Sequence, residues 1–118
     1  MANSHNGNPF FTSMSQYVQF LDMFGAEHSF QTFDDKVYNK KIIKQLHGTI
    51  KEHFFTLAQL NKKGAGVFFT VNETDLLGRT ARHITKVRAV FIDLDGTPLP
   101  TKFELQPHLI VNTSPNKY

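Results

Sequence analysis

The sequence contains no cysteine, no tryptophan and no long uninterrupted apolar run. Without cysteine the chain forms no disulfide and no thiolate metal site, so its stability must come from packing. A membrane helix needs about 20 consecutive apolar residues, and no stretch reaches that length. The first residues also lack a basic region followed by an apolar one. These absences predict a cytoplasmic protein.

The chain also lacks a strong net charge of either sign. Thirteen Lys and Arg residues against ten Asp and Glu give a formal net charge of +3. A mild positive charge permits nucleic-acid binding but does not demand it. With 118 residues and 40% hydrophobic content, the chain can form one small domain with a real core.

Two helices are predicted from capping boxes that precede apolar residues at helical spacing. The first covers about residues 13–24, with a capping box that begins at Ser13. The second is opened by Thr49 and Glu52 and closed by Gly64. Both sequences bring start and stop signals together, so they predict amphipathic helices.

Strands are predicted where β-favouring or buried-looking residues form short runs. These runs are residues 29–33, 66–71, 87–95 and 107–111. The polar segment 72–85 reads as a loop. Because helices and strands mix without regular alternation, we predict an α+β fold with a mainly antiparallel sheet, whose central strands are 66–71, 87–95 and 107–113. We predict that the domain spans residues 13–118 and follows a flexible tail, residues 1–12.

Two aspartates follow the apolar run Val87 to Ile92. In an extended strand Asp93 and Asp95 share one face, because side chains alternate between faces. Two such carboxylates repel each other unless a cation lies between them, and oxygen ligands suit Mg²⁺ or Mn²⁺. The pattern predicts a metal-dependent site for phosphoryl or nucleotidyl transfer.

Two other interpretations of the same aspartates stay open. Aspartates commonly cap backbone groups in turns, and Gly96 favours a turn as much as a site. The stretch Asp93-Leu94-Asp95-Gly96-Thr97 also resembles the first motif of the haloacid-dehalogenase phosphatases, where the first Asp attacks phosphate. In that family the motif ends the first strand of a large parallel domain, whereas here most of the chain precedes it.

A longer series of segments occurs in order along residues 28–118. The segments are Phe30-Gln31-Thr32-Phe33-Asp34-Asp35, His47-Gly48-Thr49, Leu60-Asn61, Gly64-Ala65-Gly66-Val67-Phe68, Val71-Asn72-Glu73-Thr74-Asp75, Gly78-Arg79, Val87-Arg88-Ala89, Asp93-Leu94-Asp95-Gly96 and Thr113-Ser114-Pro115. Together they resemble the RepB-like primase domains of plasmids, phages and integrated elements, within the archaeo-eukaryotic primase-polymerase superfamily. The resemblance implies an RNA-recognition-motif-like sheet with a two-metal site that joins nucleotides.

The resemblance also implies roles for individual residues. Asp93 and Asp95 match the carboxylates that hold divalent metal and would be catalytic. Ser114 and Lys117 match the opening of a motif that contacts the nucleoside triphosphate, and Arg79 is a candidate for the same ligand. The histidine of that motif and a third carboxylate would fall after Tyr118. We therefore expect the N-terminal part of a catalytic module, inactive on its own.

The lysine-rich stretch before residue 45 has two interpretations. Lys40, Lys41 and Lys44 are either solvated side chains that keep the chain soluble or contacts to a nucleic-acid backbone. Arg82 is a further candidate DNA contact. For base stacking, Phe69 or Phe91 are candidates, although core packing accounts for them equally well from sequence.

The expected function is primer synthesis on single-stranded DNA by a DNA primase or polymerase of a mobile element in a bacterial host. Nucleoside triphosphates and single-stranded DNA would be its ligands, and a replicative helicase or origin-binding domain is a further partner that the resemblance allows. The alternatives are a non-catalytic DNA-binding module, and a phosphatase that uses Asp93 as nucleophile.

Overall fold

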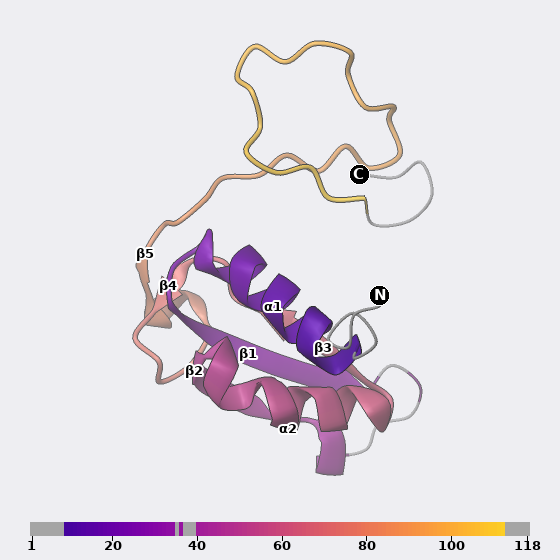
Figure 1. Ribbon diagram of the computed structural model, residues 1–118. Coiled ribbons are helices and arrows are strands. Elements are labelled where there is room, and N and C mark those ends of the chain that lie inside the picture. Colours follow the sequence, from indigo (N-terminus) through magenta and orange to yellow (C-terminus); the bar gives the residue numbers. More distant parts are fainter. Residues whose placement is uncertain (1–8, 35, 37–39, 113–118) are drawn as a thin grey trace.

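Three antiparallel strands and two helices form the body of the protein in the computed structural model, which describes residues 9–34, 36 and 40–112 (Figure 1). The elements are α1 (Pro9–Asp22), β1 (Glu27–Asp34), the 3-10 turn η2 (Lys40–Ile42), β2 (Gln45–Thr49), α2 (Ile50–Lys62), β3 (Ala65–Phe69), β4 (Glu73–Thr74), the 3-10 turn η3 (Ala81–His83) and β5 (Ile84–Lys86). This architecture confirms the predicted α+β class with an antiparallel sheet.

The first strand in the sequence is the middle strand of the main sheet. The strand order is β2-β1-β3, and β1 is antiparallel to both neighbours. Phe30 of β1 lies opposite Leu46 of β2 and Phe69 of β3. Strands β2 and β3 are therefore parallel to each other, with α2 connecting them and β1 between them. A separate two-stranded sheet joins β4 to β5.

Both helices lie on the same face of this sheet (Figure 1). Apolar residues of α2 recur at helical spacing and point toward the sheet. The buried core consists of Leu21, Phe30, Ile50, Phe54 and Leu57. Burying each such side chain contributes about 1.5–3 kcal/mol. The core therefore fixes which face of β1 is covered and which is left to other residues.

The predicted capping box of α2 is confirmed. The Thr49 hydroxyl accepts a hydrogen bond from the Glu52 backbone N–H at 3.1 Å, and the Thr49 N–H donates to the Glu52 carboxylate at 3.0 Å. Two backbone donors that a helix start leaves unpaired are thus satisfied. Gly64, with φ +106°, follows the end of the helix as predicted.

The predicted start of the first helix is wrong. Helix α1 begins at Pro9, so Ser13 lies inside it and residues 9–12, predicted as tail, are helical; residues 1–8 lie outside the described residues. Proline is well suited to a first helical position, because it lacks the N–H that a helix start leaves unpaired. Gly25, with φ +108°, follows the end of α1.

Strand β2 was not predicted, although it forms one edge of the main sheet. Its residues include few strand-favouring types, and Gly48 within it has φ +135°. Pairing with β1, from Gln45 opposite Gln31 to Thr49 opposite Glu27, gives the segment its extended form. The predicted loop 72–85 likewise contains β4, η3 and part of β5.

The predicted strands at 87–95 and 107–111 do not form among the residues that the structure describes. Residues 89–112, here called the C-terminal segment, leave the body and run through solvent (Figure 1, orange to yellow). Phe91 is 89% exposed. A strand that is apolar on both faces needs a neighbour on each side and a cover on each face. None of the described elements supplies these contacts.

Candidate nucleic-acid interface

Asp93 and Asp95 lie in an exposed turn of the C-terminal segment. The Asp93 carboxylate accepts a hydrogen bond from the Asp95 backbone N–H at 3.0 Å, and Asp95 has φ +45°. The Thr97 N–H and hydroxyl both donate to the Leu94 carbonyl, at 3.0 and 2.6 Å. The premise of two carboxylates on one face of a central strand is therefore wrong for this structure. Their catalytic and metal-binding roles stay predictions.

The two aspartates lie in a turn and not at the strand end that the resemblance implies. One oxygen of Asp93 caps a backbone donor, which is the alternative that aspartate turn chemistry suggests. Over residues 9–34, 36 and 40–112, no group of three or more His, Cys, Asp or Glu side chains is placed to hold a metal ion.

Arg79 lies over the face of the sheet that the helices leave uncovered. Its Nε–H donates to the Gln31 side-chain oxygen at 2.9 Å, and its guanidinium carbon lies 5.5 Å from the centre of the Phe33 ring. Gln31 is buried and also accepts a hydrogen bond from the Gln45 amide at 3.1 Å. These bonds orient the arginine, so a candidate anion-binding side chain is held in a defined position.

Phe33 and Phe68 form an exposed aromatic pair on this same face. Their ring centres are 5.6 Å apart and the rings meet edge to face. Phe33 is 40% exposed and Phe68 is 53% exposed. In the register, Gly66 lies opposite Phe33 and Gln31 lies opposite Phe68, so the two rings meet on a diagonal between β1 and β3. The pair and Arg79 form one aromatic and cationic surface.

The sequence candidates for base stacking are placed differently. Phe69 points to the helix side and packs against Phe20 and Phe24, with ring centres 6.0 and 5.9 Å apart. Phe91 lies in the exposed C-terminal segment. Sequence reasoning missed Phe33 and Phe68. Alternation in β1 carried a usable signal, because Phe33 shares a face with the polar residues Ser29 and Gln31.

The other half of this sheet face is closed by the segment that carries β4. The Ser29 hydroxyl, fully buried, lies 2.8 Å from His47 Nδ1 and 2.7 Å from the Thr74 hydroxyl. It also donates to the Gly78 carbonyl at 3.3 Å. A serine with no solvent contact is a packing group, not a nucleophile open to substrate. The open area is therefore confined to the end of the sheet that carries Phe33.

The predicted lysine contacts lie at that same end of the sheet. Lys40 and Lys41 belong to η2, and Lys44 precedes β2; all three are exposed. The Lys44 carbonyl accepts a hydrogen bond from the Gln31 side-chain amide at 3.2 Å, so this backbone adjoins Arg79. Arg82 is exposed on η3. Ser114 and Lys117 lie outside the described residues.

His28 is the most strongly enclosed titratable group in the body. Burial is the main cause that lowers its pKa, and the nearby Arg88 guanidinium lowers the pKa further. Arg88 donates to His28 Nδ1 at 3.2 Å and to the Glu27 carbonyl at 2.9 Å. The other ring nitrogen lies 2.9 Å from the Gly25 carbonyl and donates to it. Hydrogen bonds to both ring nitrogens thus hold the neutral imidazole in place within the body.

Two exposed carboxylates have shifted pKa values for local reasons. A hydrogen bond from His83, at 3.0 Å, is the main cause that lowers the pKa of Asp75, and the Leu77 N–H adds to it. The capping bonds with Thr49 lower the pKa of Glu52. Both shifts are explained by turn and helix-cap geometry, so neither marks a reactive acid or base.

An open cavity of about 680 Å³ lies between the end of α1 and the β4–β5 pair. Glu27, Glu73, Lys86 and Arg88 are the charged residues that line it. Arg88 and Glu73 face each other across 3.8 Å. The cavity lining includes neither the aromatic pair nor the two aspartates.

In comparisons with known proteins, no family model, no curated protein and no solved structure matches this chain. No helix of the described part of the chain is long and apolar enough to cross a bilayer.

Proposed function

We propose that this chain binds single-stranded DNA on the open end of its sheet, as the template-binding part of a primase-polymerase-like replication protein of the bacterial cytoplasm. The observation that supports this function is the exposed Phe33–Phe68 pair beneath Arg79. The choice of DNA rests on the sequence resemblance. The supporting geometry is that of a surface for unpaired bases.

Aromatic rings on a sheet face suit unpaired bases, because every base offers a flat π surface. Stacking on such a ring contributes about 1–3 kcal/mol per base and is tolerant of sequence. An arginine held over the same face adds a planar cation that stacks on bases and pairs with phosphate. The Gln31 bond that holds Arg79 in place reduces the entropy lost on binding.

A duplex fits this surface less well than a single strand. Bases in a duplex are stacked on each other, and their π faces are not available to side chains. The rings lie on a sheet, not on a helix or ribbon that enters a groove, and the described body offers no such projecting element near them. The proposal therefore assigns the aromatic pair to single strands.

Primer synthesis itself rests on the resemblance. Asp93 and Asp95 would bind Mg²⁺ or Mn²⁺, with Arg79, Ser114 and Lys117 at the nucleoside triphosphate. Incorporation of labelled nucleotides on a single-stranded template, compared with the Asp93→Asn variant, tests the catalytic part.

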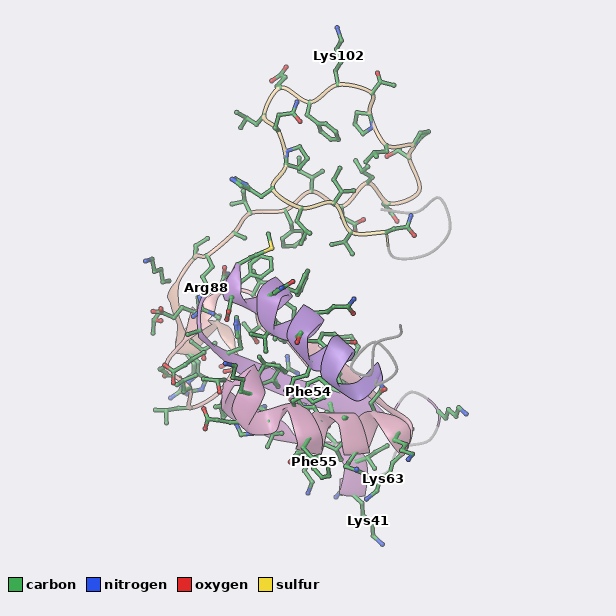
Figure 2. All side chains as sticks on the ribbon, viewed as in Figure 1. Lys41, Phe54, Phe55, Lys63, Arg88 and Lys102 are labelled. Atoms are coloured by element: carbon green, nitrogen blue, oxygen red, sulfur yellow. The ribbon has the colours of Figure 1, made fainter. Side chains whose placement is uncertain are left out.

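The test of DNA binding is fluorescence anisotropy with a labelled oligothymidine. We expect Phe33→Ala/Phe68→Ala to weaken binding by about tenfold or more, since losing about 1.4 kcal/mol of stacking corresponds to a factor of ten. Phe55→Ala is the matched control, because Phe55 is an exposed ring on α2, away from the open sheet face (Figure 2). Equal affinity of both variants and the unaltered chain would refute the proposal.

A further inference from the structure

A second group of lysines lies at the end of α2. Lys62 is in its last turn and Lys63 caps it. The C-terminus of a helix carries partial negative charge, which favours lysine there. From the sequence alone, stabilisation of the helix end is a sufficient reason for Lys62 and Lys63. In the folded chain the end of α2 packs beside η2, so Lys62 and Lys63 lie near the lysines of η2.

A buried apolar contact joins these two parts of the chain. Ile42 of η2, Leu60 of α2 and Ala65 of β3 form one cluster, and all three are buried. The Thr32 hydroxyl of β1 donates to the Ile42 carbonyl at 2.6 Å, which fixes η2 against the sheet. The turn and the helix end are therefore held together by packing.

Five lysines gather at this end of the body as a result. This basic end consists of Lys40, Lys41, Lys44, Lys62 and Lys63, all of them exposed. Figure 2 shows Lys41 and Lys63 at one end of the molecule and Lys102, on the C-terminal segment, at the other. Among the described residues, Asp34 is the acidic residue nearest in sequence to these lysines. Its carboxylate accepts a hydrogen bond from the Lys36 backbone N–H at 2.9 Å.

The basic end adjoins the aromatic pair. Phe33 and Asp34 are the last residues of β1, and Ala65, opposite Asp34, begins β3 directly after Lys63 and Gly64. The basic end and the Phe33–Phe68 pair therefore lie at the same end of the main sheet.

We propose that the basic end binds the phosphates of the same single strand, with Lys62 and Lys63 acting together with Lys40, Lys41 and Lys44. This inference rests on the proposed function and adds the path of the strand: bases on the sheet face, backbone toward the end of α2. Lysine suits this role as a mobile point charge that contacts phosphate without reading sequence.

Clustered ammonium groups repel one another, and binding a polyanion relieves that repulsion. Each phosphate neutralised on a single strand releases condensed counterions, so affinity falls with salt with a slope of about −0.7 per contact. The number of lysines on phosphate is therefore readable from salt dependence. Stacking on the aromatic pair carries no such slope.

The experiment measures the dissociation constant of the full chain for a labelled oligothymidine of about 12 nucleotides across a salt series. We expect Lys62→Gln/Lys63→Gln to reduce the slope of the logarithmic plot by about 1.4, at two contacts of about 0.7. Lys51→Gln is the charge control. Lys51 is exposed and lies in the first turn of α2, about 16 Å from Lys62 along the helix axis. It should leave the slope close to that of the unaltered chain.

The aromatic variant separates this inference from the proposed function. Phe33→Ala/Phe68→Ala should lower affinity while leaving the salt slope unchanged. If that variant binds weakly but Lys62→Gln/Lys63→Gln behaves like Lys51→Gln, the basic end is not a phosphate site and the proposed function survives. If only the lysine variant weakens binding, the shared path and the stacking function both fail.

Two further measurements keep the result interpretable. Circular dichroism and thermal melting must show that each variant is folded. Vesicles of anionic lipid test the other polyanion that a basic surface attracts. Tighter, lysine-dependent binding to vesicles than to the oligonucleotide would overturn the inference, and weaker binding would support it.

Discussion

The body and the C-terminal segment both contain apolar residues, yet they differ strongly in structure. Strand β1 buries the polar residues Ser29, Gln31 and Thr32, whereas the C-terminal segment exposes Val90 and Phe91. Hydropathy alone would predict the opposite, with Val90 and Phe91 buried and the polar residues of β1 exposed. The difference shows that a strand is stabilised by the neighbours it finds, not by its apolar content.

The buried polar groups of the body are tolerated because they are paired. Thr32 donates to the Ile42 carbonyl and accepts from the Lys44 N–H at 2.8 Å. Among the side chains that the structure describes, no buried nitrogen or oxygen lacks a hydrogen-bond partner. Pairing removes the desolvation cost that would otherwise keep such groups at the surface.

The largest expected contrast between the two regions comes from truncating one phenylalanine in each. Phe30→Ala removes a core side chain that is 2% exposed, and it should reduce the free energy of unfolding by about 3–5 kcal/mol. Phe91→Ala, at an exposed position, should change it by less than about 0.5 kcal/mol. Urea denaturation followed by circular dichroism measures both. Similar losses would mean that Phe91 is buried in solution.

A smaller effect is expected where the two regions join. Arg88 donates to the Glu27 carbonyl and to His28, and its backbone N–H donates to the Asn72 side chain at 3.0 Å. Arg88→Met leaves the first two acceptors unpaired and should cost about 1–3 kcal/mol. Lys102→Met, on the C-terminal segment, is the control.

Limited proteolysis sharpens the same comparison. Cleavage in the C-terminal segment should be rapid in the unaltered chain, since its backbone is exposed. Arg88→Met should extend cleavage toward β5. An unchanged fragment pattern, with unchanged stability, would show that Arg88 does not fasten this junction.

The smallest expected effect is a dependence of stability on pH. Burial and Arg88 lower the pKa of His28 in the folded state, so the unfolded chain binds its proton more readily. The contribution of neutral His28 is complete above its usual pKa of about 6.5 and is lost as the pH falls below that value. Denaturation between about pH 8 and pH 5 should therefore show a steeper loss for the unaltered chain than for His28→Gln. Parallel pH curves would contradict this assignment.

The parts of the fold that depend on local signals could be predicted from the sequence. The Thr49–Glu52 capping box needs only four consecutive residues, and it placed α2 correctly. The strand predicted at 29–33 is the core of β1, and the one predicted at 66–71 overlaps β3, which is an edge strand and not the central strand that was predicted. Each of these segments also finds its partner within the described body.

The parts that depend on distant partners could not be predicted. Strand β2 is extended because β1 pairs with it, and its own residues give little sign of this. The run Val87 to Leu94 has a strong strand pattern but pairs with no strand among the residues that the structure describes. Propensity is a weak guide wherever tertiary contacts decide the outcome.

The candidate site shows the same division. The lysines and Arg79 could be selected by charge, and Arg79 does lie at the open face. Phe68 could not be preferred over Phe69, because alternation says which residues share a face but not which face the helices cover. The roles of Asp93 and Asp95 stay predictions.

The strand order also has a consequence for synthesis on the ribosome. Strand β1 is made before both of its neighbours, at about 5–20 residues per second. The β1–β2 hairpin spans a short stretch and can close once Thr49 has emerged, whereas the second edge of β1 must wait for α2 and β3. The nascent chain thus carries its middle strand half paired until the last strand of the main sheet is made.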